Sequence, residues 1–183
     1  IPTELFAENN GFKVDFYDGQ DFEGSPLETK ILKGNKFWAM GGFGLDIVAQ
    51  SKRPSLSVRF NADLKPTFSG DYEFEIFSIG PSRILIDGEI IVDNWTSQDP
   101  GETFFAMGSA PRRGNFKFNE GSTYKLEVEY KWEGRFPAVQ IGMKAPDQHD
   151  LMQEAIDLAR EADAVVLIVG TNSDWETEGN DRS

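Results

Sequence analysis

Cysteine is absent from this chain of 183 residues, and histidine occurs once, as His149. Without cysteine, the chain has no disulfide scaffold, no thiolate metal site and no cysteine nucleophile. A single histidine excludes a zinc site built from several histidines, and a Ser-His-Asp triad would have to use this residue. Because His149 lies beside Asp147 and Asp150 with no serine or cysteine motif nearby, we interpret it as a surface residue.

Long apolar runs and a positive net charge are lacking as well. No segment reaches the roughly 20 apolar residues that a membrane-spanning helix needs. The 31 acidic and 18 basic residues give a net charge of −13, which repels the phosphates of nucleic acids and of anionic membranes. We therefore expect neither nucleic acid nor membrane as a partner. The sequence shows no targeting segment that would indicate a compartment.

Aromatic residues are plentiful, with 15 Phe and 4 Trp. From Gly11 to Lys144 apolar and polar residues alternate in short runs, which is typical of strands with one buried face. The clearest run is 84–92, where Asp87-Gly88 separates two β-branched segments and predicts a hairpin with a type I′ turn. Eight or more such strands predict a mainly β fold, an antiparallel β-sandwich or barrel.

The pattern changes at Pro146. Apolar residues between 151 and 162 recur at spacings of three and four, which predicts a helix with one apolar face. The run 164–170 is apolar throughout, as in a parallel strand that is covered on both faces. One helix and one strand cannot form a domain, so this segment is expected to belong to a larger α/β sheet. The predicted parts are a linker (1–10), a β-sandwich (11–145) and an incomplete α/β domain (146–183).

Two segments carry a resemblance to known families. The hairpin at 82–95 resembles the central hairpin of PA14 domains, especially the form inserted in glycoside hydrolase family 3 β-glucosidases. The run 164–170, followed by Trp175-Glu176-Thr177-Glu178-Gly179-Asn180-Asp181-Arg182, is similar to the start of the C-terminal α/β sandwich of family 3. The two segments occur in the same order in that family. The resemblance therefore implies a PA14-like sandwich followed by a short helix-strand piece of an α/β sandwich.

The family resemblance implies a retaining hydrolase of terminal β-D-glucosyl residues. Such enzymes use two carboxyl groups, one as nucleophile and one as acid/base. The nucleophilic Asp of the family lies in a barrel N-terminal to this chain, so the chain alone is expected to be inactive. Glu178 matches the acid/base position, with Asp181 and Arg182 expected to orient its loop. Asn180 departs from the pattern, because an aromatic residue is common there.

The inserted domain is implied to shape the outer sugar subsites and thus the preferred substrate length. Phe105, then Phe104, are the expected pocket-lining residues, and Trp95 lies in the same loop. Exposed aromatic rings can stack on sugar faces, and Arg112 can donate hydrogen bonds to hydroxyls. Ordinary sandwich core remains the alternative for the rings, and solvated surface for Arg112. The expected ligand is a β-glucoside or a short gluco-oligosaccharide.

No cofactor or metal is expected. PA14 domains of yeast adhesins hold Ca²⁺ through paired acidic residues, whereas the matching position here is Ile79-Gly80-Pro81-Ser82. Asn94-Trp95-Thr96 is a formal glycosylation sequon, a triplet that chance often produces.

Two alternative functions stay open: a stand-alone carbohydrate-binding or adhesin module, and a structural insertion that mediates homo-oligomerisation. If the chain is part of a β-glucosidase, the expected partners are the barrel and sandwich domains of the same protein.

Overall fold

The computed structural model describes residues 6, 11–33, 36–38, 55–134, 136–146 and 151–166. The chain divides into two compact units, Ile1–Pro146 and Asp147–Ser183. Each unit is considered by itself.

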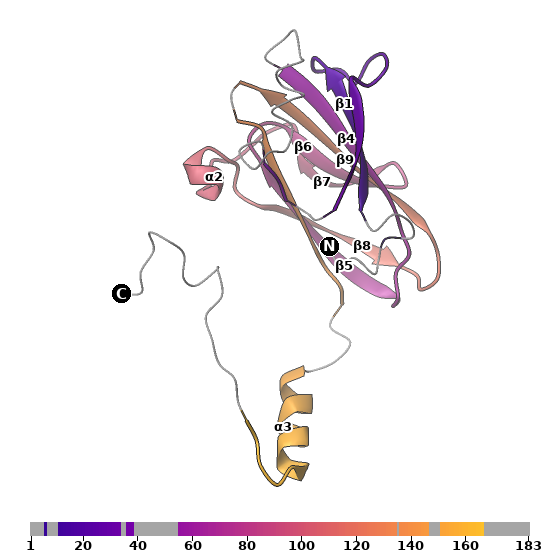
Figure 1. Ribbon diagram of the computed structural model, residues 1–183, viewed down its shortest axis with the longest axis vertical. Coiled ribbons are helices and arrows are strands. Elements are labelled where there is room, and N and C mark those ends of the chain that lie inside the picture. The colour runs from indigo at the N-terminus through magenta and orange to yellow at the C-terminus, as the bar shows by residue number, and fades with distance from the viewer. Residues whose placement is uncertain are drawn as a thin grey trace. The chain divides into compact units, whose positions relative to one another are not determined.

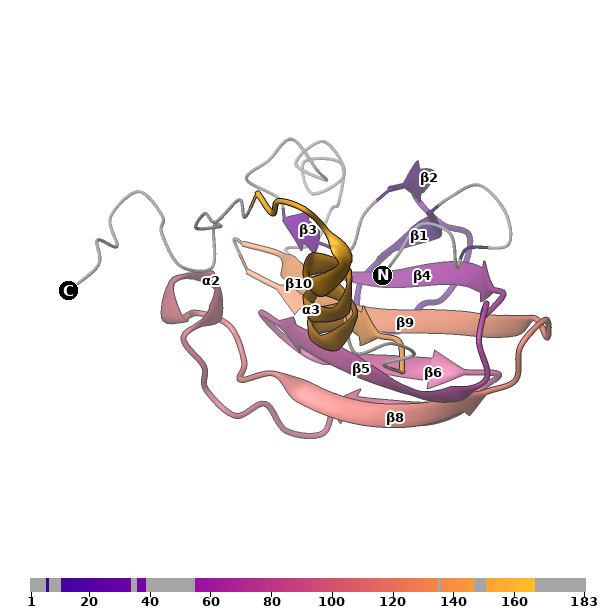
Figure 2. The same cartoon turned by 90° about the horizontal axis from the view of Figure 1, so that it is seen from below.

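The first unit is built from antiparallel strands in two sheets, the two layers visible in Figure 2. The six-stranded sheet has the order β2-β1-β4-β9-β6-β7 and the four-stranded sheet the order β3-β10-β5-β8. The strands are β1 (Phe12–Asp18), β2 (Glu28–Leu32), β3 (Lys36–Trp38), β4 (Ser55–Leu64), β5 (Gly70–Ser78), β6 (Ser82–Ile86), β7 (Glu89–Asn94), β8 (Arg112–Phe118), β9 (Tyr124–Glu133) and β10 (Ala138–Lys144). A short helical turn, α2 (Thr103–Ala106), lies between β7 and β8.

Alternating side chains build the core between the sheets. In β5, Tyr72, Phe74 and Ile76 are fully buried, while Glu73 and Glu75 between them are more exposed. The central strands β4 and β9 of the other sheet contribute side chains such as Phe60 and Trp132 in the same manner. The sequence-based prediction of a mainly β antiparallel sandwich is therefore confirmed.

The predicted β6–β7 hairpin is also confirmed. Asp87 and Gly88 have φ angles of 48° and 85°, and Ile86 pairs with Glu89 across them. A two-residue loop with positive φ at both positions is a type I′ turn, whose twist matches that of the strands. The register shifts between Ile84 and Leu85.

The edge strands β7 and β8 come close to each other where the two sheets meet. A Cβ atom on Gly114 of β8 would overlap the carbonyl oxygen of Ile91 in β7, so only glycine fits there. This close approach closes one side of the sandwich.

The connections gather at one end of the sandwich, here named the loop end. It comprises residues 19–27, 79–81, 95–111, 134 and 136–137, because β1, β5, β7 and β9 end there and β6, β8 and β10 begin there. Gln20 Nε2 donates to the carbonyl of Trp132 near the end of β9 and so ties the loop 19–27 to that strand. The chain enters β1 and leaves β10 at the opposite end (Figure 1). A Cβ atom on Gly70 would overlap the ring of Pro146 there.

The second unit contains α3 (Leu151–Glu161), which is the predicted helix. Of the predicted strand 164–170, residues 164–166 are described and are not in a strand, and 167–170 lie outside the described residues. A strand needs a neighbour to pair with, and no described strand belongs to this unit. In the part of the chain that the structure describes, no helix is long and apolar enough to span a bilayer.

Candidate functional site

The long β7–β8 loop at the loop end displays a short left-handed turn. Phe104, Phe105 and Ala106 have φ angles of 51°, 60° and 61°, a region that residues with a Cβ rarely occupy. Each such residue costs about 1–2 kcal/mol in L-amino acids. Three in succession persist only where the surrounding contacts determine the conformation, and strained backbone of this kind gathers at functional sites.

The base of this loop is narrow and tightly bonded. Pro100 bridges to Ser109, and the Gly101 amide donates to the Gly108 carbonyl at 3.0 Å. The Gly108 amide in turn donates to the Thr103 carbonyl at 3.0 Å, and the Thr103 hydroxyl donates to the Ser109 carbonyl at 2.9 Å. A Cβ on Gly101 or Gly108 would collide with these neighbours. The loop therefore has a fixed frame on which the left-handed turn stands.

The turn sends its two phenylalanine rings in different directions. Phe104 is 8% exposed and packs against Phe77 of β5, with ring centroids 5.5 Å apart. Phe105 is 77% exposed and Met107 is about half exposed. Of the two rings predicted to line a pocket, Phe105 is displayed and Phe104 fixes the turn to the sandwich. Their role toward a sugar stays a prediction.

Arg112, the first residue of β8, also supports the loop. Its guanidinium lies 2.9 Å from the carboxylate of Asp99, while the amide of Ala110 donates to the Asp99 carbonyl at 2.7 Å. The Arg112 Nε atom is buried without a hydrogen-bond partner. The side chain expected to bind hydroxyls is thus engaged in part by the loop itself.

A buried polar cluster lies beneath the loop. Asn94 is fully buried, and its Nδ2 lies 3.1 Å from each of the hydroxyls of Ser78, Ser82 and Ser109. The Ser78 and Ser82 hydroxyls are 2.7 Å apart. Because its amide nitrogen is enclosed, Asn94 is not accessible for glycosylation in the folded domain, although it heads a sequon.

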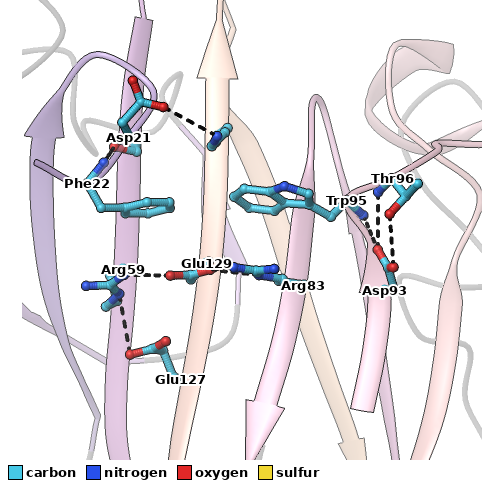
Figure 3. A network of polar contacts seen from close by, with 11 residues as sticks. Asp21, Phe22, Arg59, Arg83, Asp93, Trp95, Thr96, Glu127 and Glu129 are labelled. Atoms are coloured by element: carbon cyan, nitrogen blue, oxygen red, sulfur yellow. Dashed lines mark hydrogen bonds and ion pairs between the residues drawn. The ribbon is translucent and has the colours of Figure 1, made fainter. Parts of the chain in front are cut away.

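The outer face of the six-stranded sheet carries a row of charges beside the loop (Figure 3). Glu129 of β9 lies between Arg59 of β4, at 2.6 Å, and Arg83 of β6, at 2.7 Å. Arg59 also approaches Glu127 at 3.4 Å. This arrangement follows from the register, in which Glu129 pairs with Arg59 on one side and Arg83 on the other.

The pKa values of Glu127 and Glu129 are shifted in opposite directions. Burial by itself raises the pKa of Glu129, but the hydrogen bonds from Arg59 and Arg83 outweigh it, so the pKa lies below its usual value. At Glu127 burial raises the pKa, and the positive charge of Arg59 offsets only part of that rise. Glu129 is therefore held as a carboxylate, whereas Glu127 takes up a proton more readily.

Trp95 lies above this row rather than beside Phe105 in the turn. Its ring is stacked near that of Phe22, with centroids 6.1 Å apart, and the Arg83 guanidinium lies 4.6 Å from its centroid (Figure 3). The Lys131 ammonium lies 4.8 Å from the same ring, and Asp93 accepts the Trp95 amide at 2.7 Å. Cation–π contacts of this kind engage the ring within the protein. Phe22 had no sequence signal, because it stands in an irregular loop.

The remaining predicted site residues belong to the C-terminal segment. Glu178, Asp181 and Arg182 lie outside the described residues. Among the described residues, no group of three or more His, Cys, Asp or Glu side chains could hold a metal ion. A pocket of about 330 Å³ lies near the Asp87-Gly88 turn, away from the loop end, and none of the predicted site residues lines it.

The fold is that of a two-layered antiparallel β-sandwich. The chain belongs to the PA14 domain family, whose model matches residues 9–149. A β-glucosidase of Rhizobium radiobacter is 29% identical over an alignment of 176 residues, which covers 92% of this chain and 21% of that protein. A probable β-glucosidase H of Aspergillus oryzae is 33% identical over an alignment of 178 residues, which covers 88% of this chain and 22% of that protein.

A solved structure agrees with these sequence relatives. The β-glucosidase of Kluyveromyces marxianus, in complex with glucose, matches with a TM-score of 0.79 and 28% identity. The match covers 94% of this chain and 22% of that one. This chain thus spans about a fifth of the length of its β-glucosidase relatives.

Proposed function

We propose that this chain is the PA14 insertion, with the start of the following α/β domain, of a glycoside hydrolase family 3 β-glucosidase. The observation that carries this proposal is the extent of similarity. The Rhizobium radiobacter β-glucosidase matches 92% of the chain, more than the PA14 part alone. A stand-alone sugar-binding module would have no reason to share the helix and apolar run that follow Pro146.

Within the intact protein, the insertion supplies an outer subsite for sugar through Phe105. The exposed ring can stack on the apolar face of a glucosyl unit and exclude water there. Its position on a strained, tightly bonded turn supports this role, because such a turn presents the ring without further ordering on binding. The ligand is a β-glucoside or a short gluco-oligosaccharide, and the insertion narrows the entrance to favour short substrates.

Glu178 is the proposed acid/base residue of the intact enzyme. A retaining mechanism needs a carboxyl group that protonates the leaving oxygen and then activates water, while a second carboxylate attacks the anomeric carbon. The second carboxylate comes from the barrel of the same protein. Asp181 and Arg182 orient the loop that carries Glu178, and the chain alone is inactive.

The subsite is tested with Phe105→Ala in the full-length protein. The ratio of kcat/KM for a disaccharide to that for a longer oligosaccharide should change by about threefold to tenfold, the value of one aromatic contact. Phe68→Ala is the matched control, because Phe68 is also exposed but lies in the turn before β5 at the opposite end. If both variants keep the parental ratio while Phe105→Ala alters the assembly state, the insertion acts in oligomerisation instead.

The acid/base role is tested separately with Glu178→Ala. Turnover of substrates with poor leaving groups should fall by about 10²–10⁴-fold, because general acid catalysis contributes on that scale. Substrates with activated phenolic leaving groups should be cleaved with a smaller loss at the glycosylation step. Equal losses for both substrate types would contradict the assignment.

A further inference from the structure

The buried cluster beneath the loop joins three parts of the domain at one point. Ser78 is the last residue of β5 in the four-stranded sheet, while Ser82 and Asn94 are at the ends of β6 and β7 in the six-stranded sheet. Ser109 belongs to the loop itself. The Asn94 amide lies within hydrogen-bond distance of all three hydroxyls. A single side chain therefore ties both sheets to the loop.

The loop is coupled to this cluster through Ser109. The Ser109 amide donates to the Ser78 carbonyl at 2.9 Å, and the Ser109 hydroxyl accepts from the Ser78 amide at 3.2 Å. Its carbonyl accepts from Thr103, the residue that precedes the left-handed phenylalanines. A shift of Ser109 is thus transmitted directly to the base of the turn that presents Phe105.

Apolar side chains would fill this space at a lower desolvation cost than one amide and three hydroxyls. Buried polar groups are costly unless they are bonded, and the Asn94 Oδ1 atom has no hydrogen-bond partner. What the polar side chains supply is direction, because hydrogen bonds fix distances and angles that apolar packing does not. The arrangement is suited to locating the loop rather than to maximising stability.

We propose that Asn94 is a positioning residue, which acts on substrate selection by fixing Ser109 and hence the place of the Phe105 ring. This inference rests on the proposed function, since it takes Phe105 to be the sugar contact. Asn94 itself touches no substrate, because it is fully buried. Loss of the cluster leaves the ring on the loop but no longer holds it in place.

The test uses Asn94→Ala, Ser109→Ala and Phe105→Ala in the full-length protein, with each of the first two also combined with the third. Ser109→Ala keeps the bonds of Asn94 to both sheets, so it reports on the loop even where Asn94→Ala does not fold. Val58→Ala is the control for general destabilisation, because Val58 is buried in the core on β4, two strands from β6, and makes no hydrogen bond to the cluster through its side chain. KM and kcat are measured for a disaccharide and for a longer oligosaccharide.

The expected result is a change in the KM ratio of the two substrates, in the direction given by Phe105→Ala, with kcat altered less than twofold. In the Phe105→Ala background, Asn94→Ala and Ser109→Ala should add nothing to that ratio, since they act through the absent ring. Val58→Ala should lower the unfolding temperature without changing the ratio.

Three other results would overturn the inference, and they can be told apart. If Phe105→Ala changes the ratio while Ser109→Ala and any folded Asn94→Ala protein do not, the positioning role is wrong and the proposed subsite stands. If Phe105→Ala has no effect, the subsite proposal is wrong, and the positioning role is lost with it. If the effects on the KM ratio were fully additive in the double variants, the cluster would act on substrate selection by a route other than the Phe105 ring.

Discussion

Glu127 and Glu129 show how two identical side chains on one strand face acquire different properties. Both point outward from β9 and both are near Arg59. Glu129 accepts charge-assisted hydrogen bonds from two arginines, whereas Glu127 has a longer contact with one. Ionisation of Glu129 is thereby favoured in the folded state, and ionisation of Glu127 is opposed by burial that is only partly compensated.

Glu129→Gln should lower the free energy of unfolding at neutral pH by about 1.5–3 kcal/mol, because hydrogen bonds to charged groups contribute on that scale. The folded pKa of Glu129 lies below the ordinary value of 4.5, so the parental chain has this stabilisation above about pH 4.5 and loses it as the pH falls through the folded pKa. Urea denaturation between pH 3 and pH 7 measures both effects, and the variant should show a flatter profile below pH 4.5.

Glu127→Gln is the matched control, with the same substitution two residues away. Since the folded pKa of Glu127 lies above its ordinary value, the charged form is a cost at neutral pH, and stability rises as the pH falls through that raised pKa. The variant should be as stable as the parent at neutral pH or slightly more stable. A loss comparable to that of Glu129→Gln would contradict the opposite roles assigned to the two residues.

Individual site residues were predictable from sequence only in part. Phe105 and Phe104 were predicted to line a pocket, with sandwich core as the alternative; Phe105 is exposed and Phe104 is buried, and their role toward a sugar stays a prediction. Asn94 and Phe22 were not identified as functional candidates, because nothing local distinguishes a buried asparagine in a cluster from one on the surface. Sheet register and loop packing bring Ser109 to Asn94 and Trp95 to Phe22. The spacing of residues in a single sequence does not reveal either contact.

Elements were more predictable, and the two tight turns show why. The β6–β7 turn carries Asp-Gly, a pair that tolerates positive φ, so its conformation could be read from the sequence. The left-handed turn α2 contains two phenylalanines and an alanine, none of which favours that region. Its shape is imposed by Gly101, Gly108 and the hydrogen bonds at the base of the loop. The conformational propensities of its own residues therefore do not predict it.

Ala106→Gly should therefore stabilise the domain. Glycine occupies a φ of 61° without the penalty of a Cβ atom, and the expected gain is up to about 1 kcal/mol after the greater freedom of the unfolded chain is subtracted. Chemical denaturation of the two proteins gives the difference.

Gly88→Ala provides the reverse comparison. A Cβ there meets nothing within 4 Å, so its effect at a φ of 85° is conformational alone and should destabilise by about 1 kcal/mol. Gly142→Ala, where φ lies outside the left-handed region, should change stability less. An Ala106→Gly protein less stable than the parent would mean that the alanine methyl group makes contacts that outweigh the strain.

At the scale of the whole molecule, the two units differ in how far their described apolar side chains are buried. The sandwich encloses its own apolar core, with side chains such as Phe12, Phe74 and Ile141 fully buried. In the second unit, Leu158 is 70% exposed and Val166 is 88% exposed. Apolar residues at such positions are typical of a surface that packs against further structure. The sequence predicts one helix and one apolar run after Pro146, and that they belong to a larger α/β sheet stays a prediction.

Truncation after Pro146 should consequently leave the sandwich intact. A chain of residues 1–146 keeps every described strand and the Phe6–Leu64 bridge, so its unfolding temperature should match that of the 183-residue chain within about 2 °C. Removal of the exposed Leu158, Val165 and Val166 should also reduce self-association at high concentration, since unpartnered apolar side chains promote it. Scanning calorimetry and sedimentation velocity test the two expectations. A large fall in unfolding temperature would show that residues 147–183 pack on the sandwich, and the domain boundary near 145 would then be wrong.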